Sequence, residues 1–261
     1  MIELKTEEEV ELLRENNILV SKTLAEVAKH IKPGVTTMEL DEIAEEYIRT
    51  NGAIPGFLGY GGFPGTLCVS INEEVVHGIP SKDRVLKEGD IVSVDCGTLM
   101  KGFYGDSAFT FAVGEVDAQV AKLLEITKES LLKGVEKAVA GNRVGDISYA
   151  VQQHAEANGF SVVRELVGHG LGRKMHERPE VPNYGMRGRG PLLRKGMVIC
   201  IEPMVNLGKR EVNFSEVDGW TVTTRDKMPS AHFELAVAIT SGKPDVLTTF
   251  SFIDQILTER K

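Results

Sequence analysis

Two segments of the chain repeat one pattern of residues, and each of them ends in an acid. Residues 87–95 (KEGDIVSVD) align without a gap on residues 194–202 (RKGMVICIE), an offset of 107 residues. The same offset places Asn51-Gly52 on Asn158-Gly159. A repeat at a fixed offset predicts a duplicated fold. If both halves bring an acidic strand end toward one axis, a metal ion can bind between them.

The composition limits the class of protein. A chain of 261 residues can bury one sizeable core, or two small ones with a shared centre. A net charge of −8 argues against a protein that binds the phosphate backbone of nucleic acids. The N-terminus has no apolar region typical of a signal peptide, and no apolar run reaches membrane-spanning length. The three cysteines, an odd number, suit a reducing compartment. We therefore expect a cytoplasmic protein.

The order of the predicted elements supports the repeat. The first half reads as helices at about 6–33 and 36–52, then strands at 67–71, 91–96 and 103–113. The second half reads as helices at about 117–139 and 146–159, then strands near 161–165, 197–205, 220–224 and 233–240. Capping boxes at Thr6/Glu9 and Thr36/Glu39 mark the first two helices. This order indicates an α+β fold, a single domain over 1–261 with half-repeats at about 6–113 and 114–242.

Asp95 and Asp106 form the first candidate site. They flank a turn-like segment at 100–102. A turn centred between Met100 and Lys101 would place the two aspartates directly opposite each other, with Cβ atoms ~5 Å apart. Two ionised carboxylates this close repel, so one must take up a proton or a cation must lie between them. Two divalent ions ~3.5–4 Å apart could share one bridging carboxylate. An exposed hairpin with two solvated acids is the alternative.

The second half contributes matching acids. Glu202 ends an apolar strand equivalent to the strand that ends in Asp95, and Glu234 lies in another apolar run and aligns roughly with Asp106. A buried carboxylate needs a partner or a metal. His169 stands between two glycines, which let the backbone approach a neighbour closely. An imidazole beside four carboxylates suits Mn, Fe, Co or Zn better than Mg or Ca.

Other polar residues allow two interpretations. His77 and His176 each follow strand or loop signals, and either one can be a structural hydrogen-bonding residue or a chemical one. The cysteines next to the acids, Cys96 and Cys200, read as small core residues rather than ligands.

The five candidate ligands, in this order and spacing, resemble those of type I methionine aminopeptidases, which form subfamily A of peptidase family M24, in their short, bacterial-type form. The surrounding strings match too: HGIP at 77–80, GHGLG at 168–172, MHE at 175–177, IEPM at 201–204 and GWTV at 219–222. The resemblance covers about residues 6–240. It implies the duplicated pita-bread fold, a single catalytic domain with a pseudo-twofold internal repeat and a central antiparallel sheet covered by helices.

The resemblance also implies an activity. The enzyme would be a metal-dependent methionyl aminopeptidase that removes the initiator methionine from nascent proteins and peptides, with a preference for a small second residue. Two divalent ions (Mn, Fe, Co or Zn) would bind. Asp95 would hold one of them alone, Asp106 and Glu234 would bridge both, and His169 and Glu202 would complete the other. A bridging water would be the nucleophile, and Glu202 the candidate general base.

The remaining implied roles concern the substrate. His176 would donate to the carbonyl oxygen, and His77 would contact the scissile amide or the residue after methionine. The methionine pocket would be lined by Tyr60, Phe63, Cys68, Met175 and Trp220, with Phe57 at its rim. Three residues depart from the family pattern: Leu235 stands where histidine is common, Met175 where phenylalanine is common, and Phe57 where the residue is often small.

Further expectations and rivals follow from the resemblance. A structural monovalent cation is expected near Asn72 and Ser230. The partners would be peptide and nascent-chain N-termini, with transient ribosome association, no direct nucleic-acid specificity, no membrane contact and a monomeric state. One rival is an Xaa-Pro aminopeptidase or dipeptidase of the same fold, although 261 residues leave no room for its usual extra N-terminal domain. The others are a non-catalytic pita-bread protein that binds RNA or proteins, and an acidic cluster that holds one structural metal.

Overall fold

The computed structural model describes residues 2–259, so Met1, Arg260 and Lys261 of the predicted domain lie outside the described part. Its helices are α1 (Glu7–Ala28), α2 (Thr37–Thr50), α3 (Ala118–Val135), α4 (Val144–Ala157) and α5 (Ser251–Glu259), with a 3₁₀ turn, η1 (Tyr60–Gly62). Its strands are β1 (Ile54–Pro55), β2 (Leu67–Ile71), β3 (Glu74–Val76), β4 (Ile91–Met100), β5 (Phe103–Ala112), β6 (Ser161–Val162), β7 (Gly168–Gly170), β8 (Glu177–Val181), β9 (Val198–Ile201), β10 (Met204–Asn206), β11 (Val212–Phe214), β12 (Val222–Thr224), β13 (Ser230–His232), β14 (Leu235–Ala238) and β15 (Asp245–Val246).

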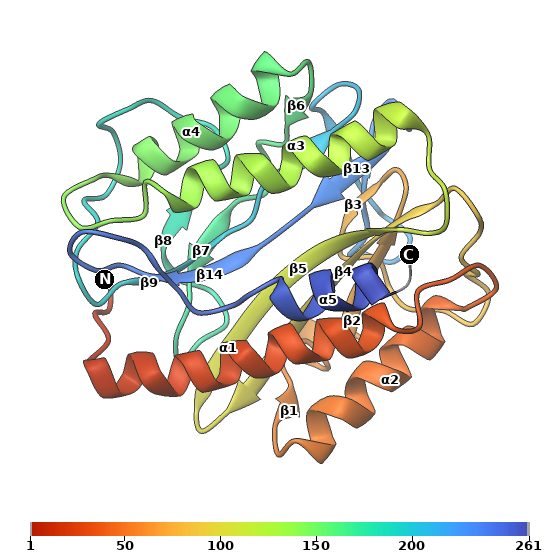
Figure 1. The fold of residues 1–261 in the computed structure, drawn as a ribbon, viewed down its shortest axis with the longest axis horizontal. Helices are drawn as coiled ribbons and strands as arrows, with labels where there is room; N and C mark the ends of the chain where they lie inside the picture. Colours follow the sequence, from red (N-terminus) through yellow and green to blue (C-terminus); the bar gives the residue numbers. More distant parts are fainter. Residues whose placement is uncertain (1, 260–261) are drawn as a thin grey trace.

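The helices form two pairs, one from each half of the chain. In Figure 1, α3 and α4 lie along the top, α1 and α2 along the bottom, and β5 and β14 run between them. All strand pairs within the named sheets are antiparallel; the two larger sheets have four strands (β1, β4, β2, β5) and five strands (β15-β14-β9-β7-β8). The predicted α+β class, with antiparallel strands covered by helices, is confirmed. Among residues 2–259, no helix combines the length and the apolar character needed to cross a bilayer.

The two halves are joined through the strands that carry the acids. The Glu234 backbone N–H donates to the Ala108 carbonyl at 2.9 Å, and the Ser107 hydroxyl donates to the Glu234 carbonyl at 2.7 Å. One apolar core spans both halves, from Leu24 on α1 to Val151 on α4. Because the two halves share a core and hydrogen bonds, their acids are held in one rigid frame.

The predicted helix starts are confirmed more closely than the helix ends. Both capping boxes, at Thr6 and Thr36, are present. However, α1 ends at Ala28 rather than near Pro33, because the next amides bond three residues back: His30 N–H donates to Val27 O at 2.9 Å. Likewise α3 ends at Val135, short of residue 139. Buried apolar residues continue past both ends, so the apolar pattern alone overestimates the helix lengths.

Two strand predictions need correction. The run at 197–205 is two strands, β9 and β10, which are interrupted where Pro203 lacks the N–H that a ladder needs. The hairpin turn consists of Lys101 and Gly102, with φ of 52° and 79°, so Met100 pairs with Phe103. This is the two-residue hairpin loop with positive φ at both positions, a geometry that favours glycine at the second position.

Helix α5 was not predicted at all.

The hairpin register changes how the two aspartates meet. Asp95 pairs with Ala108, and Asp106 pairs with Gly97, so the predicted direct opposition of Asp95 and Asp106 is wrong. Positions 95 and 97 face the same side of β4, and 106 and 108 the same side of β5. The aspartates are therefore diagonal neighbours on one face, and the expected cluster survives the shift in register.

Asp41 provides a test of the packing of α2 against β2. Its Oδ1 accepts the amides of Thr66 and Leu67 at 2.8 Å each, yet burial raises its pKa to about 6. A raised pKa contributes stability that is complete below the unfolded value near 4 and is lost as the pH rises through 6. The stability of the metal-free wild type relative to D41N should therefore fall by up to ~3 kcal/mol between pH 4 and 7.5.

Urea unfolding of both metal-free proteins across this range measures the effect. Carboxylates elsewhere in the chain titrate in both proteins and cancel in the difference. Curves that stay parallel from pH 4 to 7.5 would contradict the raised pKa.

Candidate metal centre

All five predicted ligands line one cavity, with a volume of about 190 Å³. They come from β4, β5, β7, the residue after β9 and the residue before β14, and are Asp95, Asp106, His169, Glu202 and Glu234. Each half of the chain therefore contributes carboxylates to one site. The acidic strand end of the first repeat and that of the second do meet, as the repeat predicts.

The first-half acids are held by α1. The Asn17 side-chain oxygen accepts the Asp106 backbone N–H at 3.1 Å, and the Asn16 amide donates to the Phe103 carbonyl at 2.8 Å. Both asparagines are fully buried, which is unusual for amides unless their hydrogen bonds are made. These bonds fix the hairpin on the helix and thereby set the position of the Asp106 carboxylate.

His169 lies on the short strand β7, between the two glycines. A Cβ on Gly168 would stand 2.4 Å from the Cys200 carbonyl oxygen, and a Cβ on Gly170 would stand 2.4 Å from the Arg178 carbonyl oxygen. The close backbone approach expected of these glycines is confirmed, and it lets β7 fit between β8 and β9. Here the glycines are needed for space on both sides of the histidine.

The orientation of the His169 imidazole is fixed by a hydrogen bond to the Gly170 carbonyl. Its Nδ1 lies 2.9 Å from the Gly170 carbonyl oxygen, which can only accept, so Nδ1 carries the proton. Nε2 then carries a free lone pair, and it lies 3.5 Å from Glu202 Oε1 and 3.7 Å from Asp106 Oδ2. Burial lowers the pKa of His169 to about 3, so the ring is neutral near pH 7. A neutral imidazole with a fixed tautomer is the form that ligates metals.

The carboxylates are buried without enough partners. Burial, and then neighbouring acids, hold the pKa values of Asp106 and Glu234 well above their usual range; burial raises that of Asp95 to about 6. Within residues 2–259, Asp95 Oδ1, Asp106 Oδ1 and Glu234 Oε1 are buried with no hydrogen-bond partner. Buried acceptors of this kind are costly unless a cation neutralises them. The donor set, carboxylates with one imidazole, fits divalent ions of the Mn, Fe, Co and Zn kind.

Cys200 belongs to the same compact group. Ligand atoms of Asp106, His169, Cys200 and Glu234 all lie within 4.8 Å of one another. Cys200 is completely buried, as expected of a core residue, and burial raises the pKa of its thiol well above the ordinary value. It therefore stays a neutral thiol beside the carboxylates.

The predicted substrate residues form most of the apolar wall. Phe57, Phe63, Cys68 and Trp220 line the cavity, and the Phe63 and Trp220 rings meet edge to face at 5.2 Å. Met175, which was predicted to line the pocket, is fully buried and is not among the residues that line the cavity. It lies near Phe57, since both contact the position that a Cβ on Gly97 would take. Leu235 is buried in the shared core and pairs with Ile201.

The two predicted histidines face the cavity from opposite loops. His77 has a positive φ of 59°, an uncommon conformation for a residue other than glycine, and burial lowers its pKa to about 4. The Tyr60 hydroxyl lies 2.9 Å from Nδ1 of His176. Burial lowers the pKa of His176, so its ring is also neutral near pH 7. If Tyr60 donates, the proton of His176 is on Nε2.

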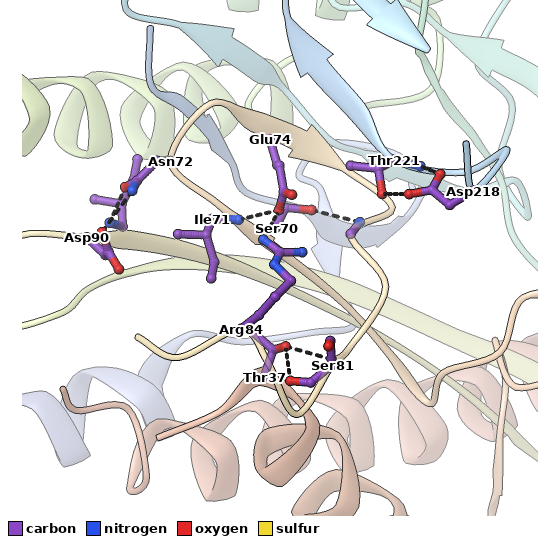
Figure 2. A network of polar contacts seen from close by, with 12 residues as sticks. Thr37, Ser70, Ile71, Asn72, Glu74, Ser81, Arg84, Asp90, Asp218 and Thr221 are labelled. Carbon is purple, nitrogen blue, oxygen red and sulfur yellow. Dashed lines mark hydrogen bonds and ion pairs between the residues drawn. The ribbon is translucent and has the colours of Figure 1, made fainter. Parts of the chain in front are cut away.

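A polar network holds the loop that carries His77. Figure 2 shows the Glu74 carboxylate between Arg84, with which it forms an ion pair, and the Ile71 amide, which donates to it at 2.8 Å. On the other side, the Gly78 N–H donates to the Ser70 hydroxyl at 3.1 Å. These contacts tie the loop down before and after His77, and they account for the retention of its strained backbone.

The residues predicted to hold a monovalent cation are brought together. The Ser230 N–H donates to the Asn72 carbonyl at 2.9 Å, and Asn72 has a positive φ of 53°. The Asn72 side chain also donates to Asp90 at 2.8 Å (Figure 2). A bound cation at this place stays a prediction.

Some cavity residues were not anticipated from the sequence. Besides the apolar Val76, Leu166, Val167 and Met204, the wall contains His232. His232 lies two positions before Glu234, and residues two apart on an extended chain share a face. That spacing is a signal that could have identified it.

Comparisons with known proteins agree with this geometry. Residues 11–241 match the model of metallopeptidase family M24. A methionine aminopeptidase of Clostridium acetobutylicum is 55% identical over 248 residues, covering 95% of this chain and 99% of that protein. The crystal structure of methionine aminopeptidase from Rickettsia prowazekii superposes with a TM-score of 0.94 at 41% identity, covering 95% of this chain and 100% of that one. A prolidase from Pyrococcus furiosus, at 24% identity and a TM-score of 0.74, shares the fold; this chain covers 65% of it.

Proposed function

Because the chain belongs to metallopeptidase family M24, we propose that it is a methionine aminopeptidase, which hydrolyses the peptide bond after an N-terminal methionine. The observation that carries this proposal is the shared cavity: five ligands, two neutral histidines and an apolar wall meet in about 190 Å³. The preferred substrates are peptides and nascent chains with a small second residue.

Divalent metal ions belong to this family's chemistry, and we propose two of them, drawn from Mn, Fe, Co and Zn. Asp95 would hold one ion alone, and Asp106 and Glu234 would contribute to both. His169 and Glu202 would complete the second, consistent with the 3.5 Å between their ligand atoms. When bound, such ions polarise the carbonyl and lower the pKa of a coordinated water. The free amino group of methionine would occupy the side of Asp95, which accounts for an exopeptidase.

Side chains of the protein accept and donate the protons of the hydrolysis. Glu202 is a carboxylate of the cavity wall and the candidate general base, which would take up a proton from water and pass it on. His176 presents Nε2–H where negative charge develops on the carbonyl oxygen, with Tyr60 fixing the tautomer through Nδ1. His77, neutral near pH 7, is placed to contact the scissile amide or the second residue.

The apolar wall supplies the preference for methionine. Phe57, Phe63, Cys68 and Trp220 offer a polarizable surface with no charge, which suits an unbranched thioether. Met175, which is buried near Phe57, would support this wall. We further propose a monovalent cation at Asn72 and Ser230, action as a monomer in the cytoplasm and transient association with the ribosome.

A peptide assay tests the function. Metal-free protein is restored with Mn²⁺, Co²⁺, Fe²⁺ or Zn²⁺ in turn and given Met-Ala-Ser, Met-Leu-Ser, Ala-Pro-Ser and N-acetylated Met-Ala-Ser. We expect metal-dependent release of methionine from Met-Ala-Ser alone. Cleavage of Ala-Pro-Ser instead would assign the chain to the proline-specific enzymes that share its fold. Tight metal binding with no cleavage of any peptide would favour a binding role.

A further inference from the structure

His232 is a buried histidine of the cavity wall that lies beside Glu202. It ends β13, opposite Met204 of β10, and its exposed fraction is 1%. Within the described residues, its Nε2 is buried without a hydrogen-bond partner. Nε2 lies 3.6 Å from Glu202 Oε2. A buried N–H without an acceptor is costly, so a nitrogen that faces a carboxylate oxygen this closely indicates an interaction that the loaded centre completes.

Glu202 thus lies between two imidazoles. His169 Nε2 is 3.5 Å from Oε1, and His232 Nε2 is 3.6 Å from Oε2. The two rings come from different strands, since His169 lies on β7 and His232 ends β13. They approach different oxygens of the Glu202 carboxylate.

The backbone of His232 is fixed from the first half of the chain. Its N–H lies 2.9 Å from the Thr110 hydroxyl, which donates to the His232 carbonyl at 2.7 Å. Ser93 holds the same hydroxyl at 2.8 Å. A ring mounted on such a backbone, in a fully buried position, has little freedom to turn elsewhere.

We propose that His232 is a positioning residue for Glu202: its Nε2–H donates to Oε2 and turns Oε1 toward the ion shared with His169. The inference rests on the proposed function, in which Glu202 is both a ligand and a proton carrier. Without the donor, the carboxylate can rotate, which weakens the second ion and misplaces the proton-accepting oxygen. Partners of this kind contribute ~10–100-fold to metal affinity or activity.

Three variants test the proposal. H232Q keeps an N–H donor of similar reach, H232F keeps a ring but no donor, and H232L removes both. The readouts are calorimetric titration of the metal-free proteins with Mn²⁺, the visible spectrum with Co²⁺, and kcat and KM for Met-Ala-Ser. We expect H232F and H232L to weaken the second bound ion and to lower kcat, each ~10–100-fold, with KM little changed. We expect H232Q to stay within a few-fold of the wild type, with two ions bound and an unchanged Co²⁺ spectrum.

Several results would overturn it. H232F and H232L that bind metal and turn over like the wild type would leave His232 with a packing role. H232Q as impaired as H232F, with one ion fewer and a changed Co²⁺ spectrum, would make His232 a metal ligand. Thermal unfolding of the metal-free variants shows whether each one is folded. Because H232F and H232L both lack the donor, the test still works if one of them does not fold. The titration needs no peptide, so a wild type that binds two ions without releasing methionine would overturn the proposed function separately.

Discussion

Replacing Asp106 with asparagine is expected to lower metal-dependent methionine release by ~10³-fold or more. At the same time, the metal-free protein should become more stable. Asp106 is 3% exposed, has an oxygen without a partner and lies beside Glu234 and Asp95, whose charges repel its own. The Asp106 carboxylate therefore destabilises the fold until a cation binds. The amide of asparagine removes this destabilising charge, but it also removes a metal ligand.

The measurement pairs activity with unfolding. We expect the metal-free D106N protein to gain ~1–2 kcal/mol of unfolding free energy, which is within the range of a single stabilising substitution. Addition of Mn²⁺ should stabilise the wild type and leave D106N almost unchanged. The matched control is D83N, because Asp83 is exposed on a loop away from the cavity. A metal-free D106N protein that is less stable than the wild type would show that Asp106 has a structural role instead.

Replacing His176 with alanine is expected to lower kcat by ~10²–10³-fold, the usual cost of one donor to a developing oxyanion. Metal binding should not change, because His176 is not one of the five proposed ligands and its Nδ1 contacts the Tyr60 hydroxyl. This combination distinguishes His176 from the metal ligands, because loss of a ligand should lower both kcat and metal affinity. Calorimetric titration with Mn²⁺ and steady-state kinetics on Met-Ala-Ser measure the two effects.

Tyr60 provides the graded comparison. Y60F removes the hydroxyl that lies 2.9 Å from His176 Nδ1, so the tautomer is less well fixed while the ring remains. We expect a loss in kcat of about tenfold, smaller than that of H176A. H154A is the control, since His154 pairs with Glu129 on the surface between α3 and α4. Equal losses in H176A and in the Asp106 variant, accompanied by loss of metal, would reject the assignment of His176 as a donor.

The local features of the chain were predictable because they depend on neighbouring residues. The capping boxes at Thr6 and Thr36 need only a residue three positions ahead, and the strand at 67–71 needs only its apolar run. Helix ends were less predictable, since the buried apolar pattern of α1 continues beyond Ala28 in a tighter turn.

The repeat was enough to predict that acids of both halves meet at the centre, because it places Glu202 where the first half has Asp95. How these residues meet depended on contacts between distant parts of the chain. The Lys101-Gly102 turn made Asp95 and Asp106 diagonal rather than opposed, because hairpin register depends on which residues accept positive φ. Likewise, nothing local marks His232 as a partner of Glu202, since the contact joins β13 to the end of β9. Distances between side chains on separate strands are set by packing of the whole core, which no short stretch of sequence encodes.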